Sequence, residues 1–139
     1  MIEELELDAT LENLDRVNEF VEQLLEDSDY PPEEKIGLDV AIEEIFVNIA
    51  DYAYAPHVGK VKITGEIERD QLSITLKFID EGKPFNPLEK ADPDLDLPIE
   101  ERPIGGLGIF LVKDSVDEIN YEYIDGKNVL TIRKKLLKE

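Results

Sequence analysis

One helical segment, residues 41–54 (AIEEIFVNIADYAY), is apolar on nearly every side yet carries a polar stripe. Glu44, Asn48 and Asp51 stand at positions i, i+4 and i+7, which places them on one face of an α-helix. A helix with this much apolar surface packs against other elements. Because desolvating a carboxylate and an amide costs several kcal/mol, the stripe predicts that something binds on this face.

Two further segments have the character of a ligand site. Residues 80–87 (DEGKPFNP) place an acid and then a glycine directly after the apolar end of a predicted strand. Residues 105–110 (GGLGIF) form a glycine cluster that runs into a helix without a Ser, Thr, Asp or Asn cap. The backbone N–H groups of such a first turn are available to phosphate oxygens, and the helix dipole favours their negative charge. Together the three segments predict a nucleotide site.

Composition restricts the class of protein. A chain of 139 residues is one domain, and its 42% of hydrophobic residues excludes wholesale disorder. No stretch approaches the roughly 18 apolar residues of a membrane span, and the first residues lack the pattern of a signal peptide. The absence of cysteine excludes disulfides and thiolate chemistry. We therefore expect a cytoplasmic protein that does not contact a membrane.

The charge of the chain is strongly negative. A net charge of −19 argues against nucleic acid as a partner, because binding phosphate backbones requires a basic surface. The same charge repels free ATP, so a nucleotide site here depends on Mg²⁺ and on a few local cations. We expect most of the acidic residues to form a solvated surface.

The order of the predicted elements defines the fold class. Helices and antiparallel strands in this order predict an α+β two-layer sandwich, a single domain over residues 1–139. Residues 88–104 contain several prolines and acids but no periodicity, which is typical of a functional or mobile loop. The residue pattern predicts strands at 2–7, 61–67, 72–78, 119–124 and 128–136, and helices at 11–24, 33–53 and 107–116.

The order E-x-x-x-N, D-x-G-x-P and G-x-G resembles the three boxes of the gyrase/histidine-kinase-like (GHKL) ATPase superfamily. Within it, the chain is most similar to the anti-sigma-factor serine/threonine kinases, over residues 2–137. The PFNP sequence after Gly82, the run GGLGIFLVKDSVDEINYEY and the later NVLTIRK carry this similarity. The resemblance implies a Bergerat-type ATP-binding fold, with a mixed, mostly antiparallel sheet, helices on one face and a lid at about 88–104.

The resemblance also implies roles for the residues of the three segments. Asn48 would bind Mg²⁺ through its amide oxygen, and Glu44 would be the general base toward an attacking hydroxyl. Asp80 would accept a hydrogen bond from the exocyclic amine of adenine, where guanine carries a carbonyl. Gly82 would let the backbone approach the ring. The other ATP-binding residues that it implies are Lys83, Pro84, Arg102, Gly105, Gly106, Leu107, Gly108 and, through water, Thr131.

Each of these features has a plainer interpretation when taken alone. The stripe can be an ordinary surface, D-x-G can be a strand-ending turn, and the glycines can be a hinge. Lys83 and Arg102 are candidate cations of the lid, but each can equally be an exposed surface charge. Asp51 departs from the family pattern, in which a basic residue often follows the metal-binding asparagine by three positions.

The resemblance implies a cytoplasmic Mg²⁺–ATP-dependent protein kinase. Its substrate would be a small anti-anti-sigma protein phosphorylated on Ser or Thr, and an RNA polymerase sigma factor would be a second partner. The family pattern also implies a homodimer. Asp51 favours one alternative, an ATP-gated protein-binding switch without kinase activity. A third interpretation is an acidic interaction domain without a ligand.

Overall fold

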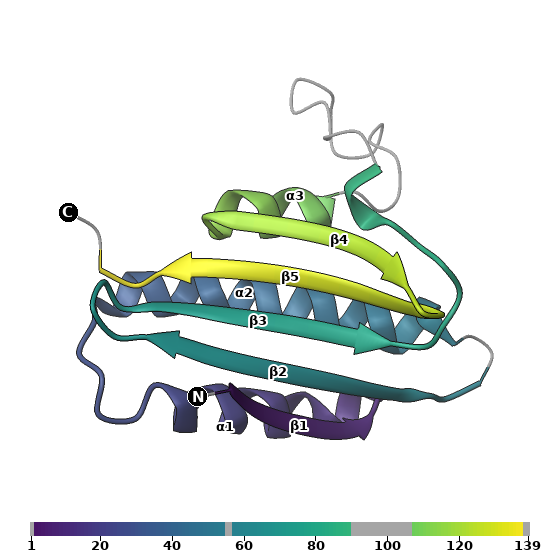
Figure 1. Cartoon of the computed structure of the whole chain (residues 1–139), viewed down its shortest axis with the longest axis horizontal. Coiled ribbons are helices and arrows are strands. Elements are labelled where there is room, and N and C mark those ends of the chain that lie inside the picture. The colour runs from purple at the N-terminus through teal and green to yellow at the C-terminus, as the bar shows by residue number, and fades with distance from the viewer. Residues whose placement is uncertain (1, 55–56, 90–106, 138–139) are drawn as a thin grey trace.

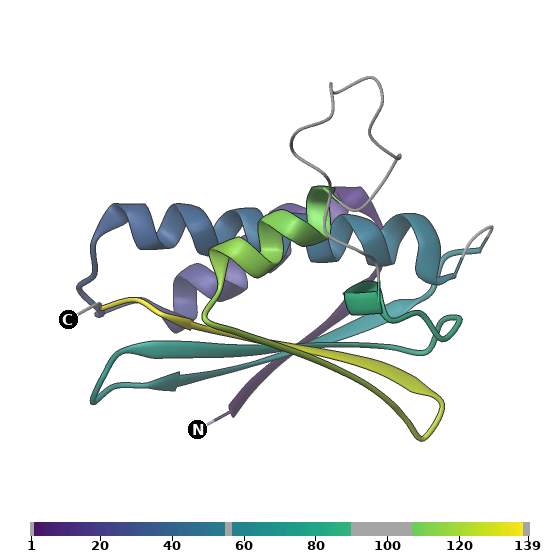
Figure 2. The ribbon, with the colours of Figure 1, turned by 90° about the horizontal axis from the view of Figure 1, so that it is seen from above.

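The structure, a computed structural model that describes residues 2–54, 57–89 and 107–137, is a five-stranded sheet with three α-helices on one face (Figures 1 and 2). This arrangement confirms the predicted α+β two-layer sandwich. The elements follow in this order: β1 (Ile2–Asp8), η1 (Leu11–Asn13), α1 (Leu14–Leu24), α2 (Pro32–Asn48), η2 (Ile49–Ala53), β2 (Lys60–Glu68), β3 (Ser73–Asp80), η3 (Pro87–Glu89), α3 (Leu107–Ser115), β4 (Glu118–Ile124) and β5 (Lys127–Lys135).

The strands lie in the order β1-β2-β3-β5-β4, and every pairing among the described strands is antiparallel. The expected mixed sheet is thus corrected to an antiparallel one. The β4–β5 hairpin turns at Asp125 and Gly126, whose φ angles of 53° and 76° are those of a two-residue type I′ turn. In the resulting register, Asn128 of β5 lies opposite Asp80 of β3.

Several boundaries differ from the sequence prediction. Thr10 makes no side-chain cap and precedes the short 3₁₀ helix η1, so α1 begins only at Leu14. The second helix has the predicted extent, but its end, η2, is wound as a π-helix. Leu72, which was predicted to be in a strand, has φ 34° and lies in the turn before β3.

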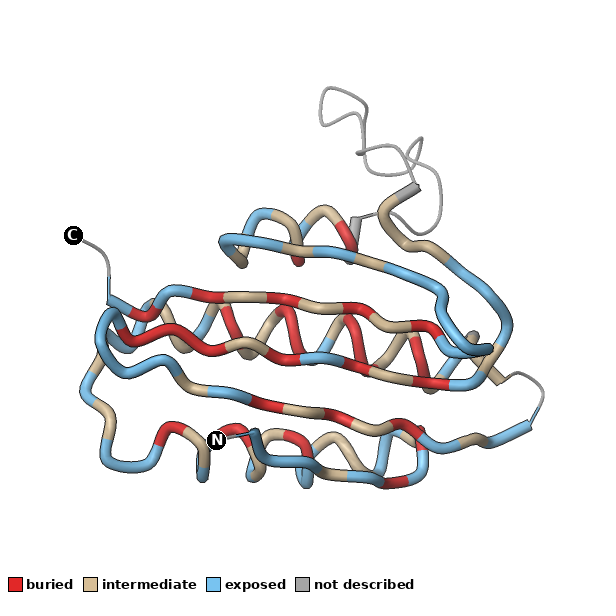
Figure 3. Tube along the Cα trace, viewed as in Figure 1, coloured by how far each residue is buried: buried red, intermediate tan, exposed pale blue. Residues whose placement is uncertain are grey.

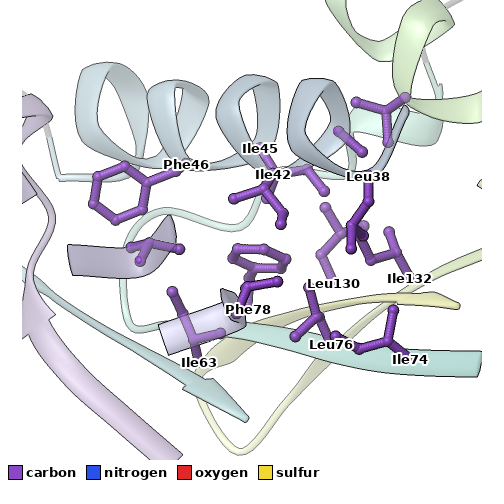
Figure 4. Packing of buried hydrophobic residues seen from close by; sticks show 14 of the residues in the cluster. Leu38, Ile42, Ile45, Phe46, Ile63, Ile74, Leu76, Phe78, Leu130 and Ile132 are labelled. Carbon is purple, nitrogen blue, oxygen red and sulfur yellow. The ribbon is translucent and has the colours of Figure 1, made fainter. Parts of the chain in front are cut away.

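The core lies between α2 and the centre of the sheet (Figures 3 and 4). Phe78 of β3 and Leu130 of β5 are neighbours in register and lie below Ile42 and Ile45 of α2, and all four side chains are buried. Burial alternates along β3 and β5 because successive side chains of a strand point to opposite faces. One face of the sheet is therefore covered by helices, and the other is open (Figure 2).

No helix within residues 2–54, 57–89 and 107–137 is long and apolar enough to cross a bilayer.

Gly65 of β2 allows α1 to lie close to the sheet. A Cβ atom at this position would come within 2.4 Å of Leu24 Cδ1 at the end of α1, and within 3.3 Å of Leu76 Cδ2 of β3. Phe20 Cε2 of α1 would be 3.5 Å away. A larger residue can fit only if α1 or its leucine moves.

We expect Gly65→Val to lower the free energy of unfolding by about 1–3 kcal/mol, because the added methyl groups overpack the contact between α1 and the sheet. Urea denaturation followed by circular dichroism measures this loss. Thr64→Val is the matched control, since Thr64 is half-exposed on the open face of the same strand, and its expected change is within about 0.5 kcal/mol. Equal stability of the Gly65→Val protein and the wild type would contradict this account of how α1 is seated.

Candidate functional site

The polar stripe of α2 is only partly covered. Glu44 and Asn48 are half-buried, whereas the adjacent Glu43 is exposed. Among the residues that the structure describes, neither the Glu44 carboxylate nor the Asn48 amide has a hydrogen bond or an ion pair with another residue. The described residues thus leave both polar groups without a partner. Asp51 is exposed in the π-helical turn and does not share the half-buried environment of the other two.

The π-helical end of this helix is bound to the loop that follows β3. The backbone N–H of Lys83 donates to the carbonyl oxygen of Ala53 at 2.9 Å. A Cβ atom on Gly82 would lie 2.2 Å from the same oxygen, so only glycine fits there. The close approach that Gly82 permits in this structure is thus to the helix end. π-helical turns often occur at functional sites.

Tyr54 adds a second connection at this end of the helix. Its hydroxyl donates to the carbonyl oxygen of Lys60 at 2.6 Å and accepts from the backbone N–H of Glu81 at 2.7 Å. Burial of the phenol raises the pKa of Tyr54, and the nearby acids Asp80 and Glu81 act in the same direction. The end of η2, the start of β2 and the end of β3 are therefore held together.

Asp80 is the last residue of β3, on the face of the sheet that the helices cover, and it is only 5% exposed. Its Oδ1 atom accepts two hydrogen bonds, from the backbone N–H of Gly82 and from Nδ2 of Asn128, each at 2.9 Å. Its Oδ2 atom has no hydrogen bond to any of the described residues. Burial raises the pKa of Asp80, and the two hydrogen bonds oppose this rise. Within the part of the chain that the structure describes, Oδ2 is the oxygen of this carboxyl group that receives no donor.

Asn128 is a member of this site that sequence reasoning missed. It is 6% exposed, and its Nδ2 atom also donates to the carbonyl oxygen of Lys83 at 2.9 Å. Its Oδ1 atom accepts from the backbone N–H of Phe85 at 3.1 Å and from the Tyr121 hydroxyl. The signal was present in the sequence, because Asn128 is the polar first member of the alternating buried series that continues through Leu130.

Thr131, in contrast, is not brought to this site. It pairs in register with Lys77 of β3 and Asn120 of β4, and it lies three positions after Asn128 along β5. Because side chains alternate along a strand, Thr131 lies on the open face of the sheet, away from Asp80. The structure therefore does not place Thr131 beside Asp80, where the family resemblance had put it, and Asn128 is the β5 residue that contacts the aspartate.

The three segments do converge at one end of the molecule. Figures 1 and 2 show α3 beginning at the end where α2 and β3 finish. The third helix starts at Leu107, as predicted, and continues through Gly108, and it buries Ile109 and Val112. Residues 90–106 lie outside the described residues. The predicted sites at Arg102, Gly105 and Gly106 and most of the predicted lid fall in this range.

The loop between Asp80 and η3 contains two of the predicted ATP-binding residues, Lys83 and Pro84. The side chains of both residues are exposed. The backbone of Lys83 is fully engaged, because its N–H binds Ala53 and its carbonyl binds Asn128. An exposed Lys83 ammonium group agrees with either interpretation of this residue, a phosphate contact or a surface charge.

No group of three or more His, Cys, Asp or Glu side chains within the described residues is arranged to hold a metal ion. Mg²⁺ in nucleotide sites is usually held by one or two side chains together with phosphates and waters. The half-buried amide of Asn48, which makes no hydrogen bond to another described residue, could supply one such ligand.

A cavity of about 470 Å³ lies elsewhere, beside α1. None of its lining residues belongs to the three segments, so it is not the predicted nucleotide site. It is lined by Glu3, Phe20, Gln23, Leu24, Ile67 and Arg69.

Comparisons with known proteins identify relatives of this chain. Serine-protein kinase RsbW of Bacillus cereus (strain ATCC 10987 / NRS 248) is 33% identical over 95 residues, and the match covers 67% of this chain and 59% of the relative. The protein of the same name from Bacillus mycoides (strain KBAB4) is 33% identical over 97 residues, with the same coverage. The match thus spans 59% of the length of these curated relatives.

A solved structure shares the fold. The crystal structure of the RsbU and RsbW domains of Rv1364c from Mycobacterium tuberculosis matches with a TM-score of 0.67 and 17% identity, covering 100% of this chain and 33% of that chain. The sequence model described as histidine kinase-like ATPase domain matches residues 7–134, which is most of the chain. The resemblance to the GHKL superfamily is thereby confirmed, and the chain belongs to the histidine kinase-like ATPase domain family.

Proposed function

We propose that this chain binds Mg²⁺–ATP and transfers the γ-phosphoryl group to a serine or threonine of a partner protein. The observation that carries the proposal is the buried Asp80, whose Oδ2 receives no donor from the described residues. Asp80 ends β3, and Asn48 ends α2, one turn after Glu44; the two elements finish at the same end of the fold (Figure 1). One acceptor for a base and two polar groups for the phosphate end are the minimum that such a site requires.

Asp80 recognises the adenine. Oδ1 is occupied by the donors of Gly82 and Asn128, so Oδ2 is the atom left to accept a hydrogen bond from the exocyclic amine of adenine. Guanine presents a carbonyl oxygen at that position, which an ionised carboxylate repels. A site built around one buried acceptor therefore selects the base that carries the donor.

The phosphates lie toward the stripe of α2 and the start of α3. The Asn48 amide oxygen is the protein ligand for Mg²⁺, which neutralises phosphate charge. The first turn of α3, from Leu107, offers backbone N–H groups to the phosphate oxygens, with Gly105, Gly106 and Gly108 as the flanking cradle. Lys83 and Arg102 are the cations that we assign to the phosphates.

Glu44 is the general base. It stands one helical turn before Asn48, about 6 Å along the axis at 1.5 Å per residue. A hydroxyl oxygen of the partner attacks the γ-phosphorus while Glu44 accepts the hydroxyl proton. The bond from the γ-phosphorus to the bridging oxygen breaks, and ADP leaves. Such a reaction requires mainly orientation and charge neutralisation, both of which a fixed helix supplies.

The names of the relatives guide the choice of partner. RsbW proteins are named serine-protein kinases, and the sequence resembles the anti-sigma-factor kinases. We therefore assign to this chain the role of an anti-sigma kinase in the cytoplasm. Its substrate is a small anti-anti-sigma protein, and an RNA polymerase sigma factor is its second partner. We also propose that it acts as a homodimer.

One observation favours a second function, an ATP-gated binding switch without phosphoryl transfer. Asp51 is an exposed acid beside the site, where the family pattern often has a basic residue. ATP would then change partner affinity by stabilising one conformation of the chain. Mass spectrometry of a partner incubated with Mg²⁺–ATP separates the two functions, because only a kinase adds phosphate.

We expect Asp80→Asn to lose ATP affinity on the order of tenfold to a hundredfold. The asparagine oxygen would replace Oδ1 between Gly82 and Asn128, and its N–H₂ group would replace Oδ2 and meet the adenine amine donor to donor. Isothermal titration with Mg²⁺–ATP and Mg²⁺–GTP measures the loss, which GTP should not share. Glu81→Gln is the control, because it removes an exposed charge one residue away. Unchanged ATP affinity in a folded Asp80→Asn protein would contradict the base contact.

We expect Glu44→Gln to bind Mg²⁺–ATP normally and to transfer phosphate about 10²–10⁴-fold more slowly, because glutamine cannot accept the proton. Phosphorylation of a purified anti-anti-sigma protein, followed by mass spectrometry, measures the rate. Glu43→Gln is the matched control, since Glu43 is the exposed neighbour on the same helix. A wild-type rate in the Glu44→Gln protein would show that Glu44 is not the base. A wild type that binds ATP without any transfer would favour the switch.

A further inference from the structure

Asn128 uses all of its hydrogen-bonding capacity inside the site. Its two N–H groups donate to Asp80 Oδ1 and to the Lys83 carbonyl, each at 2.9 Å. Its carbonyl oxygen accepts from the Phe85 N–H at 3.1 Å and from the Tyr121 hydroxyl. An amide has two donors and two acceptor positions, so a buried Asn128 is completely satisfied.

This set of partners allows only one orientation of the amide. If the amide were flipped, its N–H₂ group would face the Phe85 N–H, and its oxygen would face the Asp80 carboxylate and the Lys83 carbonyl. Both contacts would then be repulsive. The backbone of the loop, at Phe85 and Lys83, is therefore sufficient to direct the donor side of Asn128 at Asp80.

The orientation of Asn128 determines which oxygen Asp80 offers. With Asn128 and Gly82 both donating to Oδ1, the carboxylate is held in one rotamer and Oδ2 remains the free acceptor. A hydrogen bond from a neutral donor also stabilises the charged form of the acid. Without that donor, burial would favour a protonated Asp80, whose O–H group suits a carbonyl on the base instead of an amine.

We propose that Asn128 is the positioning residue that sets base selectivity, by holding Asp80 as an ionised acceptor directed at an amine-bearing purine. This inference rests on the proposed ATP binding. Asn128 does not touch the nucleotide in this scheme. It acts through Asp80, and it joins the aspartate to the loop at Lys83 and Phe85.

Other titratable groups near Asp80 do not reproduce this effect. Tyrosine titrates near pH 10, and burial raises the pKa of Tyr54 further. Val61, the β2 neighbour of Asp80 in register, does not titrate. Among the described residues, Tyr54 interacts electrostatically with Asp80 and Glu81, and the Tyr121 hydroxyl bonds to Asn128, the partner of Asp80.

The substitution Asn128→Asp tests the donor half of the Asn128 amide separately from its acceptor half. Its Oδ1 atom can still accept from Phe85 and Tyr121, while a carboxylate oxygen replaces the donor that faces Asp80. Two adjacent carboxyl groups share a proton, so Asp80 is no longer a pure acceptor near neutral pH. Tyr121→Phe is the matched control, because it removes one bond to Asn128 without touching Asp80.

The experiment is calorimetric titration of the full chain with Mg²⁺–ATP and Mg²⁺–GTP between pH 6 and pH 8.5. We expect the wild type to prefer ATP. We expect Asn128→Asp to lose ATP affinity on the order of tenfold to a hundredfold near pH 7, with a smaller ATP-to-GTP ratio. The ATP affinity of the Asn128→Asp protein should rise with pH, and this rise should occur at a higher pH than in the wild type. The reason is that the proton shared by the two carboxyl groups must be lost before Asp80 can act as a pure acceptor. Tyr121→Phe should keep the wild-type ratio.

Each outcome decides a different point. A selective wild type with an equally selective Asn128→Asp protein and an unshifted pH profile would overturn this inference alone. A wild type that binds neither nucleotide would contradict the proposed function as well. If circular dichroism shows that Asn128→Asp is unfolded, Asn128→Ala removes the same donor without adding charge. Unchanged selectivity in the Asn128→Ala protein would overturn the inference equally.

Discussion

The candidate site depends on one junction, where the end of the central helix meets the end of β3. The Ala53 carbonyl accepts the Lys83 N–H, and Gly82 lies too close to Ala53 for any side chain. Two residues earlier, Asp80 is fixed by its own loop and by Asn128. The helix that carries Glu44 and Asn48 is therefore bound to the loop that follows Asp80, so in the proposed function the two ends of a nucleotide would meet groups held at a fixed separation.

The negative charge of the chain affects the two ends of the proposed nucleotide site differently. Adenine is neutral, so a carboxylate at the base end costs no repulsion, and its burial makes the one free acceptor selective. The triphosphate is the part that a chain of net charge −19 repels. In the proposed function, Mg²⁺ at Asn48, helix N–H groups and a few cations would offset that repulsion locally, so the affinity for ATP would depend on the concentration of Mg²⁺.

Much of the fold could be predicted from the sequence, because the signals were local. Alternation identified the strands, including the two that form the last hairpin, β4 and β5. The convergence of the three segments followed from family resemblance. The contacts within the site could not be predicted in this way, since they depend on strand register and on the faces of the strands. Thr131 was assigned to the site although an odd spacing places it on the open face, and Asn128 was overlooked although it lies opposite Asp80.

The π-helical turn η2 explains why the polar stripe does not continue as a regular helix would place it. A π-helix has more residues per turn than an α-helix, so residues beyond Asn48 are rotated relative to the α-helical positions. Asp51 is consequently exposed, while the Ala53 carbonyl reaches Lys83. The same distortion thus removes an acid from the half-buried stripe and ties the helix to the base-binding loop. An acid that is held in solvent interferes less with phosphate binding than one on the stripe, which makes phosphoryl transfer compatible with Asp51.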